Sequence, residues 1–135
     1  MKPSSVEHRH FKPLEYAKLD TLMCRVMRGS SQQMGGASVT IMTFDSLIAV
    51  GASICSERDR FSRRRGRHLS SLRAAYVANV YKDDSGIYIL MPNAQHSTHG
   101  REMVGNVLGW LQFERFWRRD VAVIYDRVKR HDLQD

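Results

Sequence analysis

The stretch SVTIMTFDSLIAVGASIC, residues 38–55, decides how this chain is expected to fold. It is rich in β-branched and apolar residues, and the Asp-Ser pair at 45–46 interrupts it with a turn signal. This pattern predicts a β-hairpin with strands over 38–44 and 47–55. The second strand is apolar at nearly every position, which is typical of a strand inside a sheet with both faces covered. Gly51 within it indicates either a bulge or the close approach of another backbone.

Further elements are predicted on both sides of this hairpin. The patterns predict a helix from Pro13 to about Gly29, a helix beginning near Glu57, a second hairpin with strands 77–81 and 87–91, a helix over 101–117, and a short strand ending at Tyr125, for which a continuing helix is the alternative. Residues 1–12 are polar and are expected to form a flexible N-terminal arm, which leaves 13–135 as a single domain. The expected fold class is α+β, with an antiparallel sheet of four to five strands and helices packed on one face.

The segment SERDRFSRRRGRHLSSLRA, residues 56–74, concentrates the positive charge of the chain. It holds seven arginines and two acids, so it supplies five of the seven net positive charges. Ser56 and Asp59 form the S-x-x-D pattern of a capping box, which predicts that the helix begins directly after Ser56. A local cationic patch indicates a phosphate-bearing partner. The alternative is a solvated helix face with no ligand.

On such a helix, four of these arginines fall on one stripe. The expected phosphate-binding residues are Arg60, Arg63, Arg64, Arg67 and the neighbouring Phe61. Guanidinium groups bind phosphate bidentately, and an aromatic ring beside them suits a nucleotide or a nucleic acid. Core packing is the alternative role for Phe61. Gly66, inside the same helix, indicates either a close approach or a kink.

Aromatic residues and arginines are also interleaved near the end of the chain. The expected partner-binding residues are Trp110, Phe113, Arg115, Trp117 and Arg118. Trp and Arg are enriched in protein interfaces, so this patch indicates a protein partner or a homo-oligomer. A helix that packs these rings into the core is the alternative.

Two groups of histidines have spacings that occur in metal sites. His96 and His99, followed by Glu102, would suit a metal-dependent nuclease, and His8 and His10 flank one residue. Both groups lie in polar segments, and the chain has no P-loop, G-x-S-x-G or H-E-x-x-H motif. We therefore expect a binding protein that is not an enzyme, without a metal or a cofactor.

The compartment follows from the cysteines and from hydropathy. Cys24 and Cys55 each lie next to apolar residues and form no C-x-x-C pattern, which indicates free thiols in a reducing compartment, and a single disulfide is the alternative. The N-terminus lacks the apolar core of a secretory signal, and no apolar run approaches the ~20 residues that span a bilayer. We expect a cytoplasmic protein that does not enter a membrane.

The run AVGASICSERDRFSRRRGRHLSSLRA resembles a pattern found in small accessory proteins of bacteriophages. The matching positions are Gly51, Ala52, Cys55, Ser56, Asp59, Phe61, Arg63, Gly66, Arg67, Arg73 and Ala74. Such proteins include inhibitors of host defence, namely anti-CRISPR proteins and sponges that sequester nucleotide immune signals. The resemblance thus implies that the arginines bind nucleic acid, a nucleotide signal or an acidic patch of a host nuclease. On the alternative reading, the aromatic face would inhibit a host effector such as a CRISPR nuclease.

Overall fold

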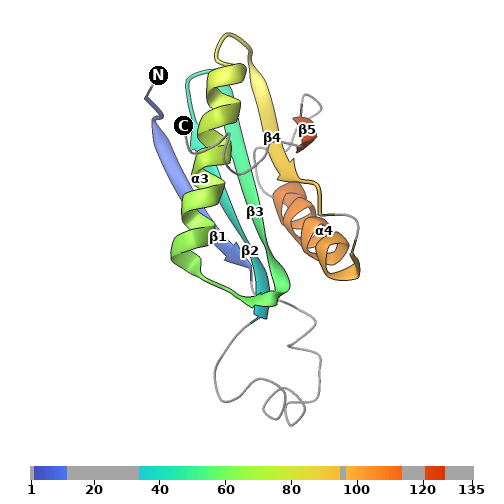
Figure 1. Ribbon diagram of the computed structural model, residues 1–135. Coiled ribbons are helices and arrows are strands. Elements are labelled where there is room, and N and C mark those ends of the chain that lie inside the picture. Colours follow the sequence, from blue (N-terminus) through green and yellow to red (C-terminus); the bar gives the residue numbers. More distant parts are fainter. Residues whose placement is uncertain (1, 12–33, 95–96, 114–120, 127–135) are drawn as a thin grey trace.

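The computed structural model describes residues 2–11, 34–94, 97–113 and 121–126 (Figure 1). Within these residues the chain forms five strands and two helices. In chain order they are β1 (Ser5–Phe11), β2 (Met34–Thr43), β3 (Leu47–Arg60), α3 (Arg63–Val80), β4 (Gly86–Pro92), α4 (Thr98–Phe113) and β5 (Val121–Asp126). Neither helix in this part of the chain combines the length and apolar character needed to cross a bilayer.

The described strands form one sheet in the order β1-β2-β3-β4-β5. β1 and β3 both pair antiparallel with β2, whereas β4 pairs parallel with β3 and β5 pairs parallel with β4. The predicted α+β class with a five-stranded sheet is therefore confirmed, and so is the hairpin in the stretch 38–55. The sheet is mixed rather than purely antiparallel, because a helix and not a tight turn connects β3 to β4.

The helices cover opposite faces of this sheet rather than the one face expected. On one face, strand residues such as Val39, Val50 and Ile89 pack with Val107 and Leu111 of α4. On the other face the packed residues are Phe44, Leu47, Ala49 and Leu90 from the sheet and Val77 and Ala78 from α3. The central strands are apolar on both faces, so each face needs its own cover.

α3 lies very close to the sheet, and two glycines allow it to do so. A Cβ atom on Gly51 would collide with the backbone of Ser70 and Ala74 in α3, and one on Gly66 would collide with the Ser38 side chain. Gly51 therefore marks a close backbone approach, and Gly66 likewise marks an approach rather than a kink. The charged half of α3 is fixed against β2 and β3 at short range as a result.

Two predicted segments have a different structure. Residues 77–81, predicted as a strand, are the last turn of α3 and its C-cap Tyr81. Residues 5–11, predicted as part of a flexible arm, form edge strand β1 and pair with β2 from Ser5↔Thr43 to Phe11↔Ala37. The helix predicted from Pro13 lies outside the described residues. The strand ending near Tyr125 is present as β5.

Candidate functional site

The charged helix begins later than the sequence predicts. β3 continues to Arg60, and α3 begins at Arg63 with Ser62 as its N-cap. The Ser62 hydroxyl accepts a hydrogen bond from the Arg65 amide at 3.2 Å. The proposed capping box at Ser56 is therefore wrong. Pairing with β2 holds the chain extended beyond Ser56, because Arg60 still pairs with Met34.

The first turn of α3 is positively charged throughout. Arg63, Arg64 and Arg65 occupy it, it contains no acid, and all three side chains are exposed. Cations at a helix N-terminus oppose the helix dipole, so this arrangement is unfavourable in the absence of an anion. No described carboxylate forms an ion pair with Arg63, Arg64 or Arg67.

The predicted stripe of four arginines is divided by the fold. Arg63, Arg64 and Arg67 are on α3, whereas Arg60 ends β3. The register of β3 against β2 shifts between Met34 and Gly36, which places Arg60 beyond a bulge. The prediction is wrong for Arg60. Helical spacing would align Arg60 with the other three arginines only if residue 60 were part of the helix.

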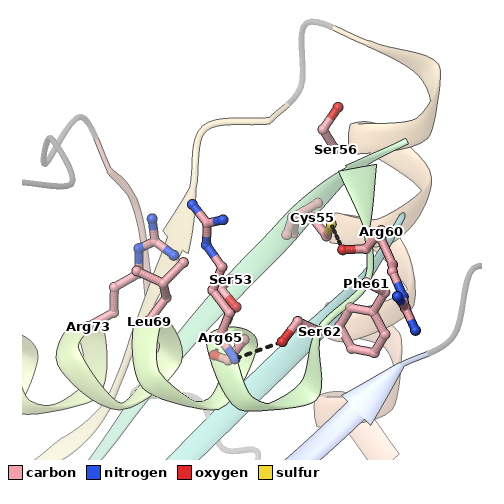
Figure 2. Close-up of a pocket in the computed structure, with 11 residues that line it drawn as sticks. Ser53, Cys55, Ser56, Arg60, Phe61, Ser62, Arg65, Leu69 and Arg73 are labelled. Atoms are coloured by element: carbon pink, nitrogen blue, oxygen red, sulfur yellow. Dashed lines mark hydrogen bonds between the residues drawn. The ribbon is translucent and has the colours of Figure 1, made fainter. Parts of the chain in front are cut away.

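Two cavities flank the start of α3. The first, which we call the arginine hollow, has a volume of about 690 Å³ and is lined by His8, Ser62, Arg64, Arg65, Arg67, His68 and Ser71. The second, which we call the Phe61 cavity, has a volume of about 340 Å³, and its lining includes Ile54, Arg60, Phe61, Arg65, Leu69 and Arg73 (Figure 2). Ser62 and Arg65 line both cavities, so the two share a rim.

Two histidines of β1 stand beside the arginines. Their Nδ1 atoms are hydrogen-bonded to hydroxyls of β2: His8 to Thr40 at 2.9 Å and His10 to Ser38 at 2.8 Å. Partial burial, followed by the charge of Arg67, lowers the pKa of His8. Partial burial, then Arg63, Arg67 and His8, lower the pKa of His10. Burial is the larger cause for both rings, and the nearby guanidinium charges act in the same direction.

Buried hydroxyls hold the arginine-bearing turn of α3 to the sheet. Thr40 Oγ1 lies 2.7 Å from Ser70 Oγ, and both residues are fully buried. The Ser53 hydroxyl donates to the Gly66 carbonyl at 3.1 Å. Buried polar groups that are satisfied in this way fix a single geometry. The arginines of α3 therefore extend from a helix that the sheet holds in a fixed position.

Phe61 sits at the junction between β3 and α3. Its ring is half-buried, meets His10 edge-on with centroids 6.0 Å apart, and lies over Gly36. Gly36 has φ +115°, and a Cβ there would come within 3.0 Å of the ring. Phe61 therefore packs against its neighbours, which was the alternative role considered for it, and it also lines the cavity.

Most of the predicted aromatic face cannot be compared with the structure. Trp110 on α4 is half-buried, with Phe11 5.4 Å away edge-on and the Arg9 guanidinium 5.6 Å from its ring centre. The side chain of Phe113 and residues 115, 117 and 118 lie outside the described part of the chain. The face stays a prediction.

The structure places two of the three residues considered as a nuclease-type metal site. His99 is 3 % exposed, and its Nε2 lies 3.2 Å from the Cys55 carbonyl oxygen, whereas Glu102 is exposed on α4. His96 lies outside the described residues. Among the residues that the structure describes, no group of three His, Cys, Asp or Glu side chains could hold a metal ion.

Sequence reasoning missed the contributions of Arg65, Arg73, His8 and His10 to this site. Arg65 and Arg73 belong to the same basic segment and are eight residues apart, a spacing that places them on one side of a helix. His8 and His10 are two apart, which places them on one face of a strand. These spacings point to the site only if residues 5–11 are known to form a strand and α3 is known to begin at Arg63.

Comparison with known proteins gives no relative: no protein-family model, no curated protein and no solved structure matches the chain. A function for the site must be inferred from its geometry and charge.

Proposed function

We propose that this protein binds a phosphate-bearing ligand, nucleic acid or nucleotide, at the arginine hollow, and that it acts by binding rather than by catalysis. The observation that carries the proposal is the first turn of α3, where Arg63, Arg64 and Arg65 stand at the positive end of the helix with no acid among them. Each such cation costs roughly 0.3–1 kcal/mol. A bound phosphate would reverse that cost, because it accepts from guanidinium groups and suits the helix terminus.

The surroundings of this turn have the same sign. Arg67 and His68 follow on α3, and His8 faces them from β1 across the hollow. The lowered pKa values of His8 and His10 follow in part from this charge. A site of this polarity attracts polyanions and phosphate esters over other ligands.

The biological role that we propose is counteraction of a bacterial defence system by a phage-type accessory protein in the cytoplasm. Its support is the resemblance of residues 51–74 together with the cationic start of α3. Sequestering a phosphorylated signal or occupying nucleic acid would both use the arginine hollow.

A second candidate is inhibition of a host effector through the aromatic face, with self-association as a variant of the same contact. The observation that favours it is Trp110, which remains partly exposed under the Arg9 guanidinium. Trp and Arg together are frequent at the energetic centre of interfaces. Quenching of Trp fluorescence by iodide, with and without a candidate effector, tests whether this face becomes covered.

The phosphate proposal is tested with a double variant and a charge-matched control. Arg64→Ala/Arg67→Ala removes two cations from the hollow, whereas Lys82→Ala/Arg101→Ala removes two exposed cations from the turn after α3 and from α4. Binding of labelled single-stranded and duplex oligonucleotides is followed by fluorescence anisotropy over a salt series. Nucleotide binding is measured by calorimetry.

For an oligonucleotide, the log–log slope of affinity against salt should fall by roughly 1.4–1.8 in the hollow variant, because two phosphate contacts are lost. A nucleotide should bind the wild type with an affinity that varies little with salt, and the hollow variant should not bind it. The control variant should keep the wild-type salt slope for oligonucleotides and the wild-type affinity for nucleotides. Equal binding of every probe by the hollow variant and wild type would refute the proposal.

A further inference from the structure

The Phe61 cavity differs in character from the arginine hollow that it adjoins. The hollow is lined by charged and hydroxyl side chains, whereas the smaller cavity combines an apolar wall with cations. Ile54, Phe61 and Leu69 form the apolar part of the wall. Its volume, about 340 Å³, lies within the range of small-molecule sites.

Three arginines line the cavity, and the fold holds one of them, Arg73, in place. Arg65 and Arg73 extend alongside each other from α3 with Leu69 between them, and Arg60 lies at the other end beside Phe61 (Figure 2). Arg73 Nη1 donates to the Ala52 carbonyl at 3.0 Å. Pairing between β3 and β4 ends one residue earlier, at Gly51↔Leu90, so the β3 segment that borders the cavity has lost its β4 neighbour.

Phe61 lines the cavity with a side chain that the fold holds in place. Gly36 and Gly66 leave room for the ring between β2 and α3, and His10 meets it edge-on. Because these contacts restrict the side chain, little rotational entropy would be lost when a ligand packs on it. Aromatic side chains held in this way stack on nucleobases.

We propose that the Phe61 cavity accepts the base of a nucleotide whose phosphates bind the arginine hollow. Arg65 and Ser62, which line both cavities, would then stand where the sugar and phosphates pass from one to the other. This inference rests on the proposed phosphate-binding function and adds to it the ligand class, a nucleoside phosphate of single-nucleotide size.

The experiment compares ligands that differ only in the base. Affinities of the four common ribonucleoside triphosphates and of ribose 5-triphosphate are measured by calorimetry for the wild type, for Phe61→Leu and for Leu69→Ala. Alkylation of Cys55, which lines the cavity, is followed in the wild type by peptide mapping after N-ethylmaleimide treatment with each ligand present.

At least one nucleoside triphosphate should bind about tenfold or more tightly than ribose 5-triphosphate, which is the range expected for one stacked base. That nucleotide should slow Cys55 alkylation, and ribose 5-triphosphate should not. Phe61→Leu or Leu69→Ala should narrow the difference in affinity between that nucleotide and ribose 5-triphosphate, and either variant suffices if the other fails to fold.

The two proposals fail in different ways. If ribose 5-triphosphate binds as tightly as every nucleotide and Cys55 stays equally reactive, the base pocket is refuted and the phosphate site stands. The base pocket is also refuted if both variants fold and keep the wild-type difference in affinity between the nucleotide and ribose 5-triphosphate. If no triphosphate binds and only oligonucleotides do, the nucleotide class is wrong. If neither kind of probe binds, the proposed function itself fails.

Discussion

Charge reversal at Arg64 tests whether the arginines in the first turn of α3 lower the stability of the protein in the absence of an anion. Ser62 is the N-cap, so Arg64 is an exposed second residue of the helix. There a cation is unfavourable, and an anion favourable, by about 0.3–1 kcal/mol each. Arg64→Glu exchanges one for the other and replaces repulsion from Arg67 by an attraction of about 0.2–0.5 kcal/mol. We expect the free energy of unfolding to rise by about 1–2 kcal/mol and phosphate binding to be lost.

The assay is urea and thermal unfolding followed by circular dichroism at low ionic strength. For a chain of 135 residues, the stability gain corresponds to a rise in Tm of about 3–7 °C. Added salt should reduce this gain in stability, because it screens the exposed charges of residue 64, Arg67 and the helix N-terminus. Lys82→Glu is the matched control: it makes the same charge change just after the C-cap Tyr81, where the dipole favours cations, so its effect should have the opposite sign.

A fall or no change in stability for Arg64→Glu would contradict this reasoning. So would an equal gain from Lys82→Glu, which would show that lower net charge alone stabilises the chain. In either case the first-turn arginines would not be a stability cost that a ligand offsets, and the main support for a phosphate site would be lost.

Three further outcomes follow from the same contacts. Gly51→Ala should destabilise the fold by about 1–3 kcal/mol or more in urea titrations, because the added methyl meets the α3 backbone; stability like that of the wild type would exclude the close helix approach. Thr40→Val should cost about 0.5–1.5 kcal/mol by removing the hydrogen bond to Ser70, whose hydroxyl still donates to the Arg67 carbonyl, and a neutral result would exclude the hydroxyl network. His8 and His10 have a pKa below 6.5 in the folded state, so their contribution to stability is present above pH 6.5 and is lost as pH falls through the folded values. A His8→Gln/His10→Gln variant should lose less stability than the wild type between pH 7.5 and 5, and parallel curves would contradict the lowered pKa values.

Several features were determined by the sequence alone, because short-range chemistry specifies them. The hairpin of β2 and β3 follows from β-branched runs around a turn at 45–46, and the apolar second strand predicted its central place. Gly51 in an apolar strand indicated either a bulge or a close backbone approach, and the structure selects the approach. The charge of the site could also be predicted, since seven arginines in one segment remain together in any fold.

The pairing partners and the grouping of the arginines were decided by the tertiary structure. Residues 77–81 are a short apolar run that suits a strand or a helix, and packing of Val77 on Leu47 and Leu90 selects the helix. The helix α3, with 18 residues and a length of about 27 Å, then carries the chain back along the sheet, which makes β4 parallel to β3. Likewise, pairing with β2 keeps Arg60 on a strand and brings His8 next to Arg67, about sixty residues later in the chain. Local sequence carries no signal for such contacts, because their free energy arises between segments that meet only when the chain is folded.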